Sequence, residues 1–231
     1  MKIKGAIFDM DGTLIDSLMF WGCLWKKIGE TYFGDPAFTP DEEVDRAVRT
    51  MIYTDAMRYV RRACGIDADE AEFLAFAASG LESFYRDTAT VKPGAAALLS
   101  HLKAQGVTIC LASATAMKEV RYALSVHGLA DSFTSVLSCA DIGAGKDKPD
   151  IYLAAMAEMG FAPEEICVFE DSFVALETAK GIGMHTVGLF DRYNFGQDRL
   201  AAASEIYLGE GVPLENILIW LCLILFGLDR F

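Results

Sequence analysis

Two carboxylates, Asp9 and Asp11, follow a short apolar run near the N-terminus and stand one residue apart. The run, residues 3–8, has the composition of a buried strand, and Gly12 comes directly after the pair. Because side chains two positions apart on an extended chain point the same way, both carboxylates would face one pocket at the end of the strand. Like charges at close range repel each other unless a cation or a basic side chain neutralises them. The alternative is a solvated Asp-Gly turn.

A second acidic pair, Glu170 and Asp171, follows another apolar run over residues 166–169. The carboxyl ends of parallel strands meet at one edge of a sheet, so this pair would join Asp9 and Asp11 there. Up to four carboxylates in one place require a cation, and an all-oxygen set of ligands favours Mg²⁺. The sequence therefore predicts a Mg²⁺ site.

Two further motifs could bind an anion. Ser113 ends the apolar run over residues 107–112 and precedes a predicted helix, where a hydroxyl and backbone N–H groups attract negative charge. An ordinary N-cap serine is the alternative. Lys146 and Lys148 precede a helix expected to begin near Asp150, which is an unfavourable place for lysine unless a negative partner lies nearby. An exposed loop lysine would need no such partner.

Positioning these residues requires a sheet whose strands end at one edge. The apolar runs after the first one predict strands at residues 107–112, 135–138, 166–169 and 185–189. The helical patterns between them lie at residues 95–105, 117–127, 150–159 and 173–180. This alternation predicts an α/β fold with a Rossmann-like parallel sheet.

Residues 17–88 have a different character, because their apolar residues recur only at helical spacing. The pattern predicts helices at residues 17–29, 41–64 and 69–85. We therefore expect a helical cap domain over residues 17–88, inserted into an α/β core of residues 1–16 and 89–231.

Composition narrows the function further. The 231-residue chain carries a net charge of −13, which disfavours nucleic-acid binding because phosphate backbones require a basic face. Its six cysteines form no CxxC pair and the N-terminus has no signal-peptide pattern, so we expect a reduced, cytoplasmic protein without a zinc site. The apolar stretch at residues 217–228 is shorter than the ~20 residues that span a bilayer. A buried terminal helix and a monomer or homodimer are expected.

The motifs in their order along the chain resemble the haloacid dehalogenase superfamily. They are D-M-D-G-T at residues 9–13, a serine after a strand, a lysine before a helix and a later acidic pair. The core motifs LASA (111–114) and EDS (170–172) are similar to the β-phosphoglucomutase-like subgroup, and the helical block looks like a type 1 cap. The resemblance covers about residues 3–190 and implies the Rossmann-like fold of that superfamily.

The resemblance also implies roles. Asp9 would be the nucleophile that forms an aspartyl-phosphate, and Asp11 the general acid and base, with its backbone carbonyl as a metal ligand. Ser113 and the backbone of Ala114 would bind the phosphate. Lys146, which stands three residues before Pro149 as in the family's K-x-x-P-D-I-Y pattern, would neutralise the phosphoryl oxygens, with Lys148 as the fallback.

For the metal, the resemblance implies that Asp171 and Asp9 bind Mg²⁺, with Glu170 acting directly or through a water. Asp11 selects phosphoester chemistry, because dehalogenating and phosphonate-cleaving members lack an acid at that position. We therefore expect a Mg²⁺-dependent phosphatase that hydrolyses a small phosphorylated metabolite, with no nucleic-acid or membrane partner.

Two alternatives stay open. In a sugar phosphomutase of this subgroup, a histidine would occupy the position of Trp21 and an arginine-serine motif would lie in the cap, but residues 49–59 have no clear match. A catalytically silent relative that binds a phosphorylated ligand or a partner protein is the other.

Substrate recognition would lie in the cap, where the candidate lining residues are Trp21, Trp25, Tyr53, Met57 and Arg58. Most of these have the spacing of helix core residues.

Overall fold

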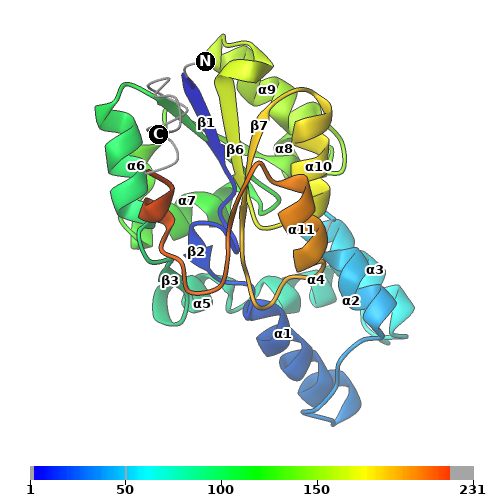
Figure 1. The fold of residues 1–231 in the computed structure, drawn as a ribbon. Helices are drawn as coiled ribbons and strands as arrows, with labels where there is room; N and C mark the ends of the chain where they lie inside the picture. The colour runs from blue at the N-terminus through cyan, green and yellow to red at the C-terminus, as the bar shows by residue number, and fades with distance from the viewer. Residues whose placement is uncertain (1–2, 50, 219–231) are drawn as a thin grey trace.

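A six-stranded sheet forms the centre of the molecule (Figure 1). The computed structural model describes residues 3–49 and 51–218. The strands lie in the order β5-β4-β1-β6-β7-β8, and every neighbouring pair is parallel. Their bounds are β1 Gly5–Phe8, β4 Thr108–Ser113, β5 Ser135–Ser138, β6 Ile166–Glu170, β7 His185–Leu189 and β8 Ile206–Leu208. The predicted parallel α/β sheet is confirmed, and β8 is a strand that the sequence patterns did not reveal.

Strand residues alternate between two apolar clusters because successive side chains point to opposite faces. In β1, Ala6 and Phe8 belong to one cluster and Ile7 to the other. The Phe8 ring stacks on Phe169 of β6, with 4.1 Å between ring centroids. Helices on both faces complete the layers: α6 Ala95–Ala104 and α7 Met117–Val126 on one, α9 Asp150–Met159, α10 Phe173–Gly181 and α11 Gln197–Ala203 on the other (Figure 1).

The helical block follows β1 and has an apolar cluster of its own, which includes Trp25, Met57 and Phe73. Its elements are α1 Phe20–Ile28, a π-helical turn Gly29–Phe33, α2 Glu42–Val48, α3 Tyr53–Ala63, α4 Glu70–Ala78 and α5 Leu81–Asp87. The two chain segments that connect the helical block to the core form a small antiparallel ribbon of β2 Ile15–Asp16 and β3 Thr90–Val91. The domain boundaries that we expect, at residues 16 and 89, stay a prediction.

The helical block departs from the sequence pattern at two places. The helix predicted over 41–64 ends at Val48 and restarts at Tyr53, after Ile52 in an extended conformation. The helix predicted over 69–85 is broken at Gly80, whose φ of +93° favours glycine. This break lets α5 turn its apolar face away from the cap and into the apolar cluster of the sheet core.

The predicted C-terminal helix at residues 217–228 lies almost wholly outside the described residues. Only Ile217 and Leu218 are described, and both pack at the cluster between the sheet and α6. Within the described chain, no helix has the length and apolar character needed to cross a membrane. The five cysteines that fall within the described ranges are free thiols.

Candidate active site

Three neighbouring strands deliver polar side chains to one edge of the sheet. Asp9 follows β1, Ser113 ends β4, and Glu170 and Asp171 end or follow β6; all four are buried. The register explains their proximity, because Phe8 pairs with both Leu111 and Phe169. Together with Asp11 they line a cavity of about 310 Å³ between the sheet edge and the helical block.

Asp9, Glu170 and Asp171 form a compact carboxylate cluster. One oxygen from each lies within 4.8 Å of the others. Burial raises the pKa of all three carboxyl groups, and Glu170 reaches a value of about 7. Three buried oxygen donors at this spacing suit a hard divalent cation, because it offsets both their desolvation and their mutual repulsion. The cluster therefore fits the expected Mg²⁺.

Lys146 is the basic side chain at the cluster. Its Nζ donates to Asp9 Oδ1 and, at 2.5 Å, to Glu170 Oε1. Burial acts to lower its pKa, but the two carboxylates outweigh it, so that the pKa stands well above the ordinary lysine value. Lys148 is exposed and does not line the cavity. Of the two lysines considered, Lys146 is the one that the fold brings to the predicted site.

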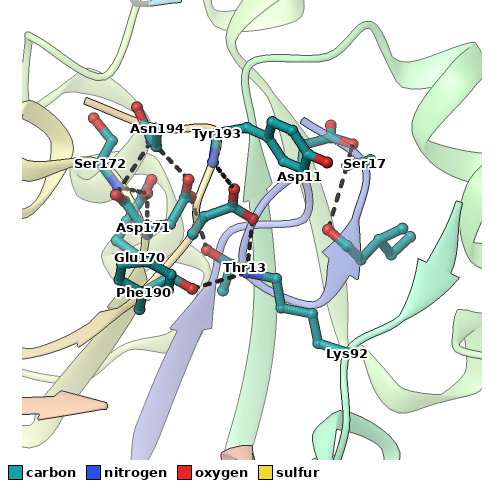
Figure 2. Close-up of polar contacts among 12 residues, drawn as sticks. Asp11, Thr13, Ser17, Lys92, Glu170, Asp171, Ser172, Phe190, Tyr193 and Asn194 are labelled. Atoms are coloured by element: carbon teal, nitrogen blue, oxygen red, sulfur yellow. Dashed lines mark hydrogen bonds and ion pairs between the residues drawn. The ribbon is translucent and has the colours of Figure 1, made fainter. Parts of the chain in front are cut away.

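Glu170 is held by the chain turn that follows β6. Its second oxygen, Oε2, accepts hydrogen bonds from the backbone N–H groups of Asp171 (3.0 Å) and Ser172 (3.1 Å) (Figure 2). Since Lys146 occupies the first oxygen, the carboxylate is fixed at both ends. This arrangement positions Glu170 beside the cluster and couples it to Asp9 through one shared ammonium group.

Asp171 is positioned by residues that the sequence patterns did not identify. Thr13 Oγ1 donates to Oδ1 (3.1 Å) and Asn194 Nδ2 donates to Oδ2 (2.7 Å), as Figure 2 shows. Gly12 packs against the same carboxylate: a Cβ atom there would lie 2.4 Å from Asp171 Oδ2, and its φ is +85°. Thr13 belongs to the D-M-D-G-T motif, which offered a signal, whereas Asn194 lies in a loop without one.

Asp11 lies apart from the carboxylate cluster. Its oxygens accept hydrogen bonds from three hydroxyl groups, those of Ser17 (2.6 Å), Tyr85 (2.7 Å) and Thr115 (2.8 Å). The three donors come from the β2 segment, α5 and the loop after β4, so they fix the carboxylate from several sides. A metal contact of Asp11 through its backbone carbonyl stays a prediction.

Ser113 does not cap the following helix. The N-cap of α7 is Ala116, and Ser113 Oγ instead accepts a hydrogen bond from Thr115 N at 3.1 Å. Both Ser113 and Ala114 line the cavity beside the carboxylates. This loop precedes the N-terminus of α7, where backbone N–H groups favour an anion such as phosphate.

The candidate substrate-contacting residues divide into two groups. Trp21 and Tyr53 line the cavity. Trp25 and Met57 are buried in the cap cluster, and Arg58 is partly exposed and pairs with acidic neighbours. Helical spacing alone cannot separate these cases, because the cap has a core and a cavity on adjacent faces of the same helices.

Comparison with known proteins agrees with this geometry. The model of the haloacid dehalogenase-like hydrolases matches residues 3–183. A phosphorylated carbohydrates phosphatase of Thermotoga maritima is 25% identical, with 94% of this chain and 98% of the relative covered. Hexitol phosphatase A of Escherichia coli is 28% identical, with 82% and 84% covered.

Among solved structures, a β-phosphoglucomutase of Clostridium difficile superposes with a TM-score of 0.75. The match covers 97% of this chain and 99% of the other at 17% identity, so it shows a shared fold. The family match spans strands β1, β4, β5 and β6 of the sheet, the cap and the carboxylate cluster. The chain therefore belongs to the haloacid dehalogenase-like hydrolases, as its motifs indicated, and is an enzyme of the phosphoric monoester hydrolase class.

Proposed function

We propose that this enzyme is a Mg²⁺-dependent phosphatase that hydrolyses a small phosphorylated metabolite through an aspartyl-phosphate. The observation that carries the proposal is the different setting of its two aspartates. Asp9 lies in the carboxylate cluster against Lys146, whereas Asp11 faces the same cavity in a shell of hydroxyl groups. One carboxylate is thus placed beside positive charge, and the other is placed to exchange protons.

In the proposed reaction, a carboxylate oxygen of Asp9 attacks phosphorus and the bond from phosphorus to the leaving oxygen breaks. Asp11 gives its proton to that oxygen, which departs as an alcohol. Asp11 then takes a proton from a water whose oxygen attacks phosphorus, and the Asp9–phosphorus bond breaks to release inorganic phosphate. Lys146 and the Ser113–Ala114 loop bind the phosphoryl oxygens throughout.

The carboxylate cluster supports the choice of cofactor. Asp9, Glu170 and Asp171 would hold Mg²⁺, which when bound supplies positive charge for the phosphoryl group. The hydrogen bonds from Thr13 and Asn194 keep Asp171 turned toward the cluster. Oriented ligands of this kind bind a metal more tightly than free side chains, because less conformational freedom is lost.

The phosphatase is favoured over the phosphomutase by the residue at position 21. Trp21 lines the cavity where a mutase of this subgroup would carry a histidine. The names of two relatives, which refer to phosphorylated carbohydrates and to hexitols, support a small phosphorylated substrate. A silent binding relative is disfavoured because it would need neither Asp9 against Lys146 nor the hydroxyl shell of Asp11. We expect the enzyme to act in the cytoplasm as a monomer or homodimer.

The test is a phosphate-release screen over sugar phosphates, nucleotides and short phosphoesters, with Mg²⁺ or with a chelator. Release should require Mg²⁺ and should vanish in Asp9→Asn. Asp16→Asn, an aspartate of β2 outside the cavity, is the matched control and should retain activity. Undiminished release by Asp9→Asn would overturn the nucleophile assignment. Isomerised sugar phosphate in place of free phosphate would identify a mutase, and ligand binding without turnover would identify a silent relative.

A further inference from the structure

The wall of the cavity opposite the carboxylate cluster is aromatic and aliphatic. Phe20 lies 5.2 Å from Phe84 and 6.3 Å from Tyr53, and Tyr53 lies 6.3 Å from Trp21, measured between ring centroids. Leu74 lines the cavity beside them. The wall thus presents ring faces and edges contributed by α1, α3, α4 and α5, all of which belong to the helical block.

The tyrosine and serine hydroxyls beside this wall are already engaged inside the protein. The hydroxyl of Tyr53 donates to Ala77 O at 2.9 Å, which directs it away from a substrate. Those of Ser17 and Tyr85 donate to Asp11. Among the described lining residues, Thr54, Glu119, Asp147 and Ser172 have polar side chains that form no hydrogen bond with another described residue, and the same holds for the indole N–H of Trp21.

The positive charges of the cavity are also paired. Among the described residues that line it, Lys146 and Arg49 are the cations. Lys146 contacts two carboxylates of the cluster, and Arg49 pairs with Asp45 at 3.1 Å and donates to Tyr193 O at 2.8 Å. Both cations are therefore already paired with carboxylates, and of the Arg49 guanidinium only Nε forms no hydrogen bond with a described residue.

These observations decide which leaving group fits. An open polyol would lose its hydration on entering this cavity, and each hydroxyl that faces the rings would stay unpaired, at a cost of about 1–3 kcal/mol for each buried group. A planar apolar body would instead bury its faces against the rings of the wall. The volume of about 310 Å³ is at the lower end for small-molecule sites, so the body is no larger than a small ring system.

We infer that the substrate is a monophosphate ester whose leaving alcohol carries an aromatic ring or a similar planar apolar group, in preference to a polyol. This inference rests on the proposed phosphatase function. It assigns Trp21, Phe20 and Tyr53 to the recognition of that group.

The first experiment compares primary alkyl phosphates, so that the chemistry of the leaving oxygen is matched. With Mg²⁺ present, kcat/KM for 2-phenylethyl phosphate should exceed that for glycerol 3-phosphate and for sorbitol 6-phosphate by roughly tenfold or more. Equal or higher values for the polyol esters, with Asp9→Asn still inactive, would overturn the inference and leave the proposed function intact.

The second experiment removes one ring of the wall. Trp21→Ala should lower kcat/KM for 2-phenylethyl phosphate about tenfold and change it less than about twofold for glycerol 3-phosphate. The control is Phe33→Ala, which removes an exposed aromatic of the same block outside the cavity and should alter neither value. An equal loss for both esters would contradict the assignment of Trp21.

Binding decides the inference even when no ester is turned over. Calorimetry of the Asp9→Asn variant with Mg²⁺ should give a Kd for 2-phenylethyl phosphate about tenfold below that for glycerol 3-phosphate. Such selective binding, with no turnover by the unmodified enzyme, would refute the proposed phosphatase function. It would support the inference that the cavity prefers an aromatic leaving group. Equal Kd values would refute the inferred preference for an aromatic leaving group, whatever the measured activity.

Discussion

The guanidinium of Arg49, at the end of cap helix α2, donates a 2.8 Å hydrogen bond to the backbone oxygen of Tyr193, in the loop after β7. The same guanidinium lies 4.9 Å from the centroid of the Phe195 ring. The residue between these two partners, Asn194, donates to Asp171 of the carboxylate cluster. One loop of the core therefore contacts both the cap and a candidate metal ligand.

We predict that Arg49→Ala lowers kcat/KM roughly tenfold. A hydrogen bond from a charged group contributes about 1.5–3 kcal/mol, and here it joins the cap to the core over the cavity. Steady-state kinetics on the best ester of the screen provide the measurement. Arg62→Ala, an exposed arginine of α3, is the control and should behave like the unmodified enzyme. Unchanged kinetics in Arg49→Ala would show that this contact is not needed to hold the cap against the core during catalysis.

Asn194→Ala should raise the Mg²⁺ concentration needed for half-maximal activity by about 10- to 100-fold. The variant removes the 2.7 Å hydrogen bond that turns Asp171 toward the cluster, but it leaves the three carboxylates in place. A Mg²⁺ titration of activity and calorimetry of Mg²⁺ binding would both report the change. Asn216→Ala, which alters an exposed asparagine far from the cluster in sequence, serves as the matched control. An unaltered Mg²⁺ titration would mean that Thr13 and the backbone suffice to orient Asp171.

Tyr85→Phe should lower kcat about tenfold with little change in KM. The substitution keeps the ring in its apolar cluster and removes one hydroxyl donor from Asp11, which we propose as the acid and base of the reaction. Kinetics and a thermal unfolding measurement together separate positioning from folding, because the unfolding temperature should stay within a few degrees. Tyr59→Phe in α3 is the control. A change confined to KM would argue that Tyr85 contacts substrate instead of positioning Asp11.

The stability of the protein without Mg²⁺ should fall as the pH rises from about 4.5 to about 7. Burial raises the pKa of Glu170 from 4.5 to about 7, so the folded state binds more protons than the unfolded state within this window. The pKa values of Asp9 and Asp171 are raised in the same direction. Release of these protons leaves buried carboxylates that are charged, and this lowers the stability of the folded protein. A bound cation offsets that loss of stability.

Thermal unfolding at pH 5.5 and pH 8, with and without Mg²⁺, measures this dependence. The increase in unfolding temperature on adding Mg²⁺ should be larger at pH 8, because the carboxylates must be ionised to bind the metal. Glu170→Gln should flatten the pH dependence of the metal-free protein. An equal Mg²⁺ effect at both pH values would contradict the proposed link between ionisation and metal binding.

Five strands of the sheet and the cluster were predictable because they depend on local patterns, whereas β8 was not. The apolar runs of β1, β4 and β6 end directly in polar residues, as with Asp9 after β1 and Asp171 after β6, and parallel strands share one carboxyl edge. Tyr85 and Asn194 were not predictable. Tyr85 meets Asp11 from 74 positions away, and Asn194 meets Asp171 from a loop, so neither contact leaves a short-range pattern.

The helix breaks in the cap show a second limit of prediction from the sequence. Apolar spacing continues across Gly80 as though one helix ran from residue 69 to residue 85, although the two halves pack in different clusters. Apolar spacing indicates that residues are buried, but it does not indicate which apolar cluster they enter. The glycine itself was the available signal, since it adopts a positive φ that other residues avoid.

The position of β1 in the sheet sets an order of events during synthesis. Gly5 pairs with Thr108 on one side and with Ile166 on the other, so β1 leaves the ribosome well before either of its partner strands has been made. The cap is contiguous and has its own apolar cluster, so it can collapse in the meantime. An unfinished chain thus carries Asp9 without its partners Glu170 and Asp171, and the candidate active site is incomplete until those residues have been made.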